Sequence, residues 1–291
     1  MRILVAGGQG QVGSALAQLG LEQNLDLVAL GRQDLDITSA DSVSFVFAKY
    51  QPDLLINAAA YTAVEDAENE PELAFAINEK AIALLAEACV QRGIPMLHIS
   101  TDYVFDGLKD GAYVETDPVN PMSVYAKSKE AGERLLRERL DKHIILRTSW
   151  VFGVQGNNFV RTVVRMAKVR DRLEIVDDQC GGPTSARAIA HVLLEIASQL
   201  NVHRTVAWGT YHFSQKPYVS RYQFALAIVE QARNSCLIDH PVDTIPISSR
   251  DFSTSVMRPG NSRLESKLLE INFKIKASSW LNDLCELLNV E

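Results

Sequence analysis

Tyr125 and Lys129, within the segment SVYAKSKEAGERLL (residues 123–136), lie four positions apart. On an α-helix this spacing puts two side chains on the same face. An ammonium group beside a phenol favours the phenolate, so we expect the pKa of Tyr125 to fall below its ordinary value of about 10 and the phenol to deliver a proton near neutral pH. The pair alone is weak evidence, because this spacing also arises by chance.

Hydroxyl side chains end an apolar segment that precedes this predicted helix. The segment HISTDYVFDG (98–107) overlaps the apolar run PMLHIS (95–100) and contains Ser100 and Thr101. In open α/β sheets, ligands bind at the carboxyl ends of the strands. Thr101, Tyr125 and Lys129 form a hydroxyl, phenol and ammonium set suited to polarise and protonate a ketone oxygen. The sequence therefore predicts a carbonyl-reducing site at this sheet edge.

The segment VAGGQGQVGS (5–14) is a candidate cofactor loop between a predicted strand and a predicted helix. In that context glycines let the backbone approach a pyrophosphate at a helix N-terminus. Gly8-x-Gly10-x-x-Gly13 is the fingerprint of ordinary dehydrogenases, whereas Gly7-x-x-Gly10-x-x-Gly13 has the wider spacing found with a catalytic tyrosine. A glycine-rich turn without a ligand is the alternative. We favour nucleotide binding, with contacts from Gly7, Gly10, Gln11, Val12 and Gly13.

The residues after the second predicted strand bear on the choice of cofactor. NAD-specific sites usually place an acidic residue about twenty residues beyond the glycine loop. Here the segment ALGRQDLD (29–36) has Leu30, Gly31 and then Arg32, whose planar guanidinium suits a 2′-phosphate. We therefore predict NADPH, with NADH possible; the alternative for Arg32 is a solvated surface side chain. Asp36 is a further candidate, on the adenine side.

Short apolar segments rich in branched residues must position these groups. They are RILVA (2–6), LDLVAL (25–30), DLLINAAA (53–60), PMLHIS (95–100) and HIILRTSW (143–150). Continuous apolarity indicates strands buried on both faces, as in a parallel sheet. The clearest helix runs from Pro71 to Arg92 and is closed by Gly93. This alternation predicts an α/β fold with a doubly wound, Rossmann-like parallel sheet.

The alternation loosens after about residue 150, where a helix is predicted over 156–170 and a strand and turn over 173–184. We expect an NADP-binding domain over 1–150 and a smaller mixed α/β substrate domain over 151–291. Part of 173–205 is expected to pack back on the first domain.

Composition narrows the function classes. The net charge is −7 and the charges are interspersed, which argues against nucleic acid and membrane surfaces as partners. The 4 cysteines are far apart and form no metal-binding spacing, so we expect reduced thiols. No apolar run reaches the roughly 18 residues of a membrane span, and MRILVAGG is too short for a signal peptide core. We expect a cytoplasmic protein.

Beyond these local patterns, segments in chain order resemble the extended short-chain dehydrogenase/reductases, and among them the dTDP-4-dehydrorhamnose reductases. They are NAAAYTAVEDAE (57–68), STDYVFDG (100–107), VYAKSKEAGE (124–133), RTSWVFG with GNNF (147–159), DDQCGGPT (177–184) and RPGNSRL (258–264). The resemblance covers nearly the whole chain and favours the Gly7 reading. It implies Tyr125 as the acid, Lys129 as its partner and Thr101 as the hydrogen-bond donor to the C4 oxygen. NADPH would reduce dTDP-4-dehydro-L-rhamnose to dTDP-L-rhamnose.

The same resemblance implies further binding residues. Ala58, Ala59 and Ala60 would form a wall under the nicotinamide. Trp150 would pack near the sugar, with plain core packing as the alternative. Arg258 would contact the diphosphate, with a surface arginine as the alternative. The remaining predicted substrate contacts are Asp102, Tyr103, Asn157 and Asn261.

One departure from the resembled family concerns a metal. Some members are thought to gather magnesium at a dimer interface, with acids on the first helix and after the PT turn. This chain has Ser14-Ala15 and Ser185-Ala186-Arg187 at those places, without a carboxylate for a hard cation. We therefore expect no metal and doubt a metal-bridged dimer, which leaves a monomer or another homodimer.

Two other functions stay open. A nucleotide-sugar epimerase or dehydratase of the same superfamily is one, since a dehydratase needs an acid beside the catalytic hydroxyl and Asp102 follows Thr101. Arg32 and RPGNSRL argue against it. A non-catalytic NADP-binding regulatory subunit is the other, against which the intact Thr, Tyr and Lys set argues.

Overall fold

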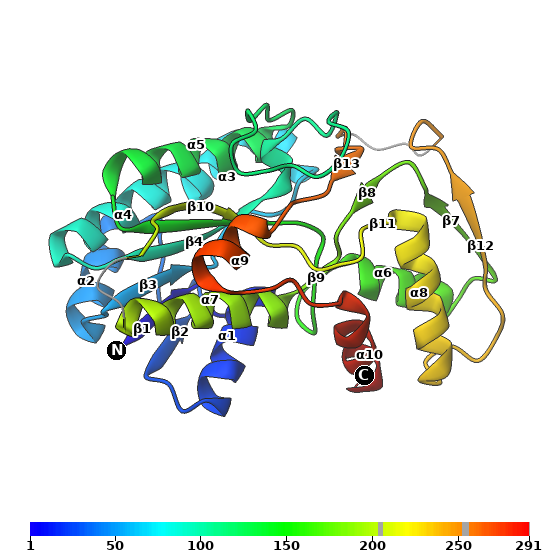
Figure 1. The fold of residues 1–291 in the computed structure, drawn as a ribbon, viewed down its shortest axis with the longest axis horizontal. Coiled ribbons are helices and arrows are strands. Elements are labelled where there is room, and N and C mark those ends of the chain that lie inside the picture. The colour runs from blue at the N-terminus through cyan, green and yellow to red at the C-terminus, as the bar shows by residue number, and fades with distance from the viewer. Residues whose placement is uncertain (203–205, 252–255, 291) are drawn as a thin grey trace.

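The centre of the molecule is a parallel sheet. The computed structural model describes residues 1–202, 206–251 and 256–290. Its 6-stranded sheet has the order β10-β5-β4-β3-β1-β2 (Figure 1). The strands are β1 (Ile3–Ala6), β2 (Leu27–Leu30), β3 (Leu54–Asn57), β4 (Met96–Thr101), β5 (His143–Thr148) and β10 (Gly209–His212). The predicted fold class is confirmed, and the predicted apolar segments are β1 to β5. β10 was not predicted, because its residues GTYH lack an aliphatic run.

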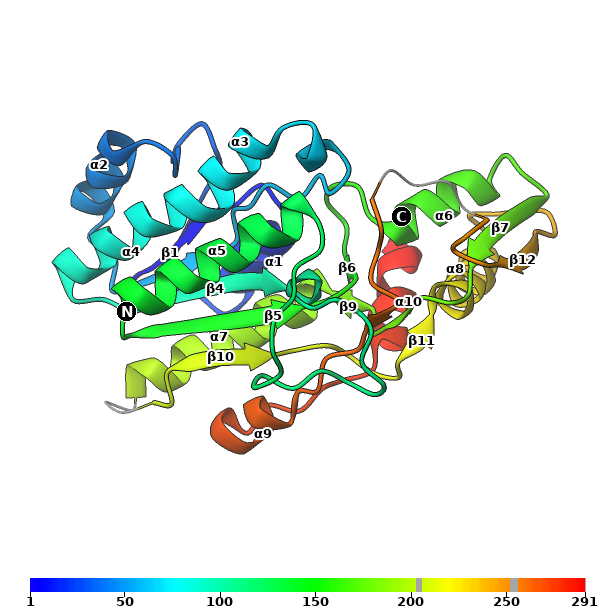
Figure 2. The same cartoon turned by 90° about the horizontal axis from the view of Figure 1, so that it is seen from above.

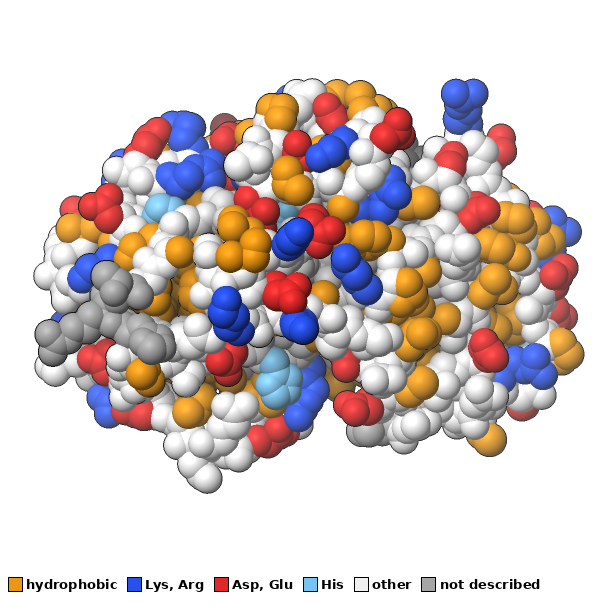
Figure 3. Space-filling view, viewed as in Figure 1, with side chains coloured by type: hydrophobic (Ala, Val, Ile, Leu, Met, Phe, Trp, Pro, Cys, Tyr) orange, Lys and Arg blue, Asp and Glu red, His pale blue; other side chains and the backbone are white. Residues whose placement is uncertain are grey.

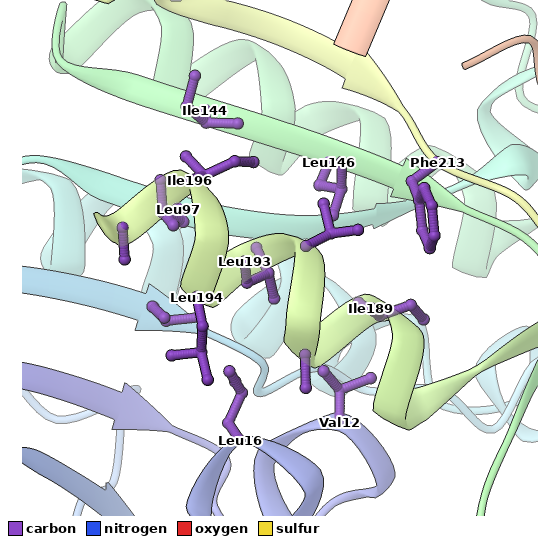
Figure 4. Close-up of a cluster of buried hydrophobic side chains, with 14 of the residues drawn as sticks. Val12, Leu16, Leu97, Ile144, Leu146, Ile189, Leu193, Leu194, Ile196 and Phe213 are labelled. Atoms are coloured by element: carbon purple, nitrogen blue, oxygen red, sulfur yellow. The ribbon is translucent and has the colours of Figure 1, made fainter. Parts of the chain in front are cut away.

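Both faces of the sheet are covered by helices. In β1, Ile3 and Val5 belong to the core that includes α1 (Gln11–Glu22) and α7 (Ala186–Val202). Figure 4 shows side chains of α7 between α1 and the strands. Leu4 and Ala6 belong to the core with α2 (Ala40–Tyr50) and α4 (Ala81–Arg92) on the other face (Figure 2). Burial on both sides explains why every position of β1 is apolar.

The predicted helix from Pro71 to Arg92 is interrupted by a wider turn. It consists of α3 (Pro71–Phe75), the π-helical turn η2 (Ala76–Lys80) and α4. Within η2, the side chain of Asn78 accepts a hydrogen bond from the Tyr61 backbone N–H (2.9 Å) and donates to the Tyr61 carbonyl (3.0 Å). It also donates to Ser128 Oγ (2.9 Å), on α5 (Val124–Arg139). The π turn thereby ties α5 to the loop after β3.

A second lobe follows β5. Its core is shared by α6 (Phe159–Ala167), α8 (Arg221–Asn234), α10 (Trp280–Val290) and the parallel pair β7 (Arg172–Val176) and β12 (Asp243–Ile247). Short strands complete it: β8 (Cys180–Gly181) with β11 (Val219–Ser220) and β13 (Asn261–Ser262), and β6 (Val151–Phe152) with β9 (Thr184–Ser185). This lobe lies beside the sheet in Figure 1.

Several segments after residue 150 return to the sheet. They are α7, β10 and α9 (Lys267–Phe273), whose apolar side chains join the core on the α1 face. The domain division at residue 150 stays a prediction, since the sheet layer draws on both sides of it. Residues 203–205 of the predicted returning segment, 252–255 of the predicted loop region and the terminal Glu291 lie outside the described residues.

The surface shows mixed charge. On the face over α7, acidic and basic side chains are interspersed (Figure 3). Among the described residues, no helix is both long and apolar enough to cross a membrane. The cysteines at 89, 180, 236 and 285 are all unpaired.

Candidate active site

A cleft of about 1520 Å³ lies between the lobes and is lined by residues at the carboxyl ends of β3, β4 and β5. Single-ligand pockets commonly measure about 300–1,000 Å³, so this cleft has room for a cofactor and a substrate together. The predicted site residues that line it are Gly10, Gln11, Val12, Ala58, Ala60, Thr101, Asp102, Tyr103, Tyr125, Lys129, Trp150, Asn157 and Arg258. Gly7, Gly13, Arg32, Asp36, Ala59 and Asn261 are not part of the lining.

The glycine loop packs closely against the end of β2 and against the residues that follow β3. Gly7 has a φ of +84°, and a Cβ there would lie 2.6 Å from the Ala59 backbone nitrogen. The Gly10 N–H donates to the Gly7 carbonyl oxygen (3.0 Å), and a Cβ on Gly13 would overlap that oxygen. Gly8 instead packs against the backbone of Ala29. Positions 7, 8 and 13 therefore all lack room for a side chain, so close packing requires glycines that belong to both spacings.

The loop leads into an open helix N-terminus. Gly10 is the N-cap of α1 and supplies no side-chain cap, and the first turn has no acidic residue. Backbone N–H groups of this turn therefore carry the partial positive charge of the helix end without a side-chain partner at the cap. Gly10, Gln11 and Val12 line the cleft at this point. The arrangement can bind a pyrophosphate.

Arg32 and Asp36 follow β2, at the edge of the sheet. Arg32 is exposed. The Asp36 carboxylate accepts hydrogen bonds from Thr38 Oγ1 (2.6 Å) and the Thr38 N–H (2.9 Å), which lower the pKa of Asp36. Its side chain is thus engaged within its own loop, and the role of Arg32 toward a 2′-phosphate stays a prediction.

The catalytic candidates converge from β4 and α5. Ser123 caps α5 by accepting a hydrogen bond from the Ala126 N–H, and Tyr125 and Lys129 are both buried. Thr101, at the end of β4, donates from Oγ1 to Asp102 Oδ1 (3.1 Å) and is hydrogen-bonded to Tyr125. The hydroxyl and the phenol therefore lie beside each other, and the amine of Lys129 lines the same cleft.

The pKa of Tyr125 is raised, so the expected lowering is wrong. Burial is the main cause, since Tyr125 is only 8% exposed, and the charges of Asp102 and Tyr103 act in the same direction. The hydrogen bond with Thr101 opposes them. Lys129 does not offset the burial; its Nζ donates to the Ile99 carbonyl (2.8 Å) instead. Tyr125 therefore holds its proton, as an acid must before it acts.

A buried ion pair supports α5 from the sheet side. Arg147 donates to Glu133 from Nε (2.9 Å) and Nη2 (2.6 Å), and both residues are almost fully buried. Burial raises the pKa of Glu133, but the hydrogen bonds and charge of Arg147 outweigh it and hold the pKa at about 2. The bidentate pair thus fixes α5 against β5.

Asp102 is a buried carboxyl beside the catalytic hydroxyl. Burial raises the pKa of Asp102 to about 6, against hydrogen bonds from Ser262 and Thr101 that lower it. Its Oδ2 has no hydrogen-bond partner among the described residues. An acidic proton on this oxygen is thus available near pH 6.

Trp150 belongs both to the cleft lining and to the second core, and its contact with the sugar stays a prediction. Its backbone φ is +48°, a conformation that is uncommon for a non-glycine residue and concentrates at functional sites. The indole lines the cleft and also packs in the second core, with its ring centroid 6.4 Å from that of Phe224. A Cβ on Gly181 would lie 2.6 Å from the indole, which explains a glycine in DDQCGGPT.

Arg221 is a candidate functional residue that sequence analysis missed. Its guanidinium lies over the rings of Trp150 (3.7 Å) and Phe159 (4.9 Å) and lines the cleft. Burial lowers the pKa of Arg221 to about 10, and its Nε has no hydrogen-bond partner among the described residues. A signal existed: Ser220 caps α8, so Arg221 puts a cation in the first turn, where the helix dipole disfavours it. Such a half-buried guanidinium that lines the cleft suits an anionic ligand.

Arg258 and Asn157 both line the cleft. Arg258 Nη2 donates to Glu65 Oε1 (2.9 Å), an ion pair between partly exposed side chains of the two lobes. Asn157 is exposed in the cleft lining. Both side chains are accessible to a ligand.

Asn261 has a structural role instead of the predicted contact. Its Nδ2 donates to the carbonyls of Lys109 and Gly111 (2.7 Å each), and its Oδ1 accepts from the backbone N–H (3.1 Å) and Nε (2.8 Å) of Arg263. The side chain is only 6% exposed. Its donors and its acceptor are thus used to hold loops together.

The positions considered for a metal carry other interactions. Ser14 Oγ donates to the Gly10 carbonyl (2.8 Å), and Ser185 Oγ donates to Asp283. Arg187 forms an ion pair with Glu22 (2.9 Å) between α7 and α1. Within the described ranges, no group of three or more His, Cys, Asp or Glu side chains is arranged to hold a metal ion.

Comparison with known proteins assigns the family. The model of the RmlD substrate binding domain family matches residues 1–291. The dTDP-4-dehydrorhamnose reductase of Aggregatibacter actinomycetemcomitans is 45% identical over 280 residues, which are 96% of this chain and 95% of that protein. The crystal structure of a dTDP-4-dehydrorhamnose reductase from Clostridium acetobutylicum has a TM-score of 0.92 and 35% identity, covering 100% of this chain and 99% of the other. The Bacillus anthracis enzyme in complex with NADP has a TM-score of 0.89 and 32% identity, at the same coverage. This chain belongs to the RmlD family of dTDP-4-dehydrorhamnose reductases.

Proposed function

We propose that the protein reduces the C4 ketone of dTDP-4-dehydro-L-rhamnose to dTDP-L-rhamnose with NADPH. The observation that carries this proposal is the meeting of Thr101, Tyr125 and Lys129 in one cleft with an open helix N-terminus. The relatives named above are dTDP-4-dehydrorhamnose reductases, and the Bacillus anthracis enzyme binds NADP. Both findings support the proposal.

The cofactor side of the cleft fits a dinucleotide. The N-terminus of α1 would hold the pyrophosphate, and Ala58 and Ala60 leave a low wall on which a flat ring can lie. Lys129 would hold the nicotinamide ribose, and Arg32 would bind the 2′-phosphate. When bound, the cofactor supplies a hydride to C4.

On the substrate side, Thr101 would donate a hydrogen bond to the ketone oxygen and Tyr125 would transfer its proton to that oxygen. The C4–H bond formed from the hydride and the O–H bond formed from the tyrosine proton complete the alcohol. The raised pKa would keep the proton on Tyr125 until the ketone oxygen accepts it. Proton transfer by a positioned side chain typically contributes about 10²–10⁴-fold to the rate.

The second lobe would bind the nucleotide diphosphate. Arg221 and Arg258 are cations in the cleft lining, and guanidinium groups bind phosphate oxygens in a bidentate manner. Trp150 would pack on the sugar, with Asn157, Asp102 and Tyr103 as polar neighbours. Arg221 is preordered by its stacking on Trp150, which limits the entropy lost on binding.

The test measures NADPH oxidation at 340 nm with dTDP-4-dehydro-L-rhamnose. Tyr125→Phe should lower kcat at least about 100-fold while NADPH affinity is retained. Tyr222→Phe is the matched control, because Tyr222 does not line the cleft, and it should turn over like the wild type. Unchanged turnover in Tyr125→Phe would remove this tyrosine from the mechanism. NADPH binding without oxidation by the wild type would instead favour a regulatory subunit.

One observation favours a second candidate. Asp102 is a buried carboxyl with its pKa raised to about 6 beside Thr101, as a dehydratase acid would be. A dehydratase would act on a 4-hydroxyl sugar nucleotide without net oxidation of NADPH. Consumption of such a sugar nucleotide with no change in absorbance at 340 nm would therefore support the dehydratase function.

For the oligomeric state, we propose a monomer or a homodimer without a metal bridge. Support comes from the side chains at 14, 15 and 185–187, which include no carboxylate. Light scattering should give the same mass with magnesium and with a chelator; dissociation on chelation would refute the proposal.

A further inference from the structure

Buried polar groups continue from Lys129 into the sheet. Asn57 of β3 and His98 of β4 are paired in register, and both are 0% exposed. Asn57 Nδ2 lies 3.1 Å from His98 Nδ1, and His98 Nε2 lies 3.5 Å from Lys129 Nζ. Nζ also donates to the Ile99 carbonyl (2.8 Å). The reaction proposed above uses neither Asn57 nor His98.

A backbone amide fixes the direction of these hydrogen bonds. The Ala59 N–H donates to Asn57 Oδ1 (3.1 Å). A backbone N–H can only donate, so this contact identifies the oxygen of the Asn57 amide. The NH₂ group of Asn57 therefore points at His98 Nδ1 and donates to it. His98 Nδ1 must accept and cannot carry a proton.

The direction at Nδ1 decides the tautomer. A neutral imidazole without a proton on Nδ1 carries it on Nε2. The imidazolium is disfavoured, because burial and the neighbouring Lys129 lower the pKa of His98 well below its ordinary value. The Nε2–H then faces Lys129 Nζ. It can donate to the lone pair of a neutral amine, but it opposes an ammonium group, which has only donors.

We propose that Asn57 and His98 are positioning residues for the catalytic lysine: the Nε2–H of His98, oriented by Asn57, favours the neutral amine of Lys129 over its ammonium form. This rests on the function proposed for Tyr125 and Lys129. After Tyr125 has given up its proton, an N–H bond of the ammonium breaks and an O–H bond forms on the phenolate. The amine that remains accepts the hydrogen bond of His98 and then takes up a proton from bulk solvent, which is the one proton that the reduction consumes.

The charged groups around the hydrogen-bonded series Asn57, His98 and Lys129 are consistent with a lowered pKa of Lys129. Burial lowers the pKa of Lys129 to about 8, and Glu133 on the same helix opposes this. The charge of Glu133 is largely balanced by Arg147 on β5, and Arg137 on α5 also pairs with it. His143, at the start of β5, acts on His98 in the same direction as Lys129.

The experiment uses NMR of the full-length, ligand-free protein. Histidine ¹⁵N labelling reports the tautomer of His98, assigned by the loss of its signals in His98→Gln. Lysine ¹³Cε labelling reports the titration of Lys129, assigned through Lys129→Met. We expect the Nε2–H tautomer and a Lys129 midpoint of about 8, against about 10.4 for ordinary lysines. An Nδ1–H tautomer in the wild type would overturn the proposal.

Asn57→Asp keeps the shape of the side chain but replaces its NH₂ donor with an acceptor. A carboxylate accepts from the Ala59 N–H and also from His98, so the proton should move to Nδ1. The bare Nε2 then accepts from an ammonium group, and the Lys129 midpoint should rise by about one unit or more. In a His98→Gln background the same substitution isolates the direct effect of the new charge on Lys129. The rise of the Lys129 midpoint should then be smaller than in the protein that keeps His98. The proposal would be refuted if the Lys129 midpoint rose equally in both backgrounds. It would also be refuted if Asn57→Asp alone left that midpoint unchanged.

These readouts are independent of the reaction. They come from the ligand-free protein, so failure to reduce the 4-dehydro sugar would leave them intact. Conversely, full reductase activity in a protein whose His98 carries its proton on Nδ1 would reject only the role of His98 and would leave the proposed function intact.

Discussion

Gly132→Ala tests whether the contact between α5 and the π turn positions the catalytic pair. An added Cβ would overlap the carbonyl oxygen of Asn78 and lie 3.1 Å from its carbonyl carbon and 3.2 Å from Ile82 Cγ1. Unlike a side-chain end, the Asn78 backbone cannot rotate away, because Asn78 is held by Tyr61 and Ser128. The methyl group must therefore push α5 outward.

The size of the effect follows from this geometry. Carbon atoms in contact lie about 3.5–4.0 Å apart, so relief requires a movement on the order of 1 Å. Overpacking of this kind costs about 1–3 kcal/mol, from which up to about 1 kcal/mol of better helix propensity is subtracted. Tyr125 and Lys129 move with α5, and a misplacement of about 1 Å can cost about 10²-fold in rate. We expect a lower Tm and a fall in kcat of about that size.

The assay combines thermal unfolding with NADPH oxidation at 340 nm. Gly20→Ala in α1 is the matched control, because the nearest atoms that its Cβ would meet are 3.2 Å away, in Leu27, and relief needs only a few tenths of an ångström. Gly20→Ala should keep both Tm and kcat near the wild type. If Gly132→Ala kept the wild-type kcat, α5 would not be positioned by its contact with the π turn.

Three further outcomes are expected. Arg32→Ala should raise KM for NADPH and spare NADH, because only NADPH has a 2′-phosphate; equal effects on both would refute that contact. Arg221→Gln should raise KM for the nucleotide sugar more than the Kd of NADPH, measured by steady-state kinetics and fluorescence titration, and a normal sugar KM would reject the diphosphate role. Glu133→Gln should lose about 3–5 kcal/mol of stability at pH 7, because it leaves Arg147 buried without its counterion. Since the folded pKa of Glu133 is about 2 and its ordinary value is 4.5, the contribution of the pair is complete above about pH 4.5 and is lost as pH falls toward 2. The Tm difference between wild type and Glu133→Gln should therefore shrink with acidification, and a difference that is constant down to pH 3 would contradict this account.

The strands of the sheet were predictable because burial on both faces requires continuous apolar runs, which leave a local mark. β10 was not, because it lies at the sheet edge and its residues Gly209 to His212 have no such run. The π turn was not predictable either, because Pro71 and Gly93 mark only the two ends of a helix and not a wider turn inside it. The π turn packs against Gly132 of α5, which is 54 positions along from Asn78, so this contact leaves no local signal.

By itself the sequence determined the chemistry available: a glycine loop ahead of a helix, a tyrosine and a lysine one helical turn apart, and a hydroxyl at a strand end. These depend on short-range spacing, which backbone geometry converts directly into position. Tertiary structure alone decided what each group faces. It turned Lys129 toward Ile99 and His98, raised the pKa of Tyr125 by burial, engaged Asn261 in loop contacts and brought Arg221 over Trp150. The exclusion of solvent sets the protonation of these groups, and residues distant in the sequence supply their contacts. Local spacing in the sequence encodes neither the burial nor the distant partners.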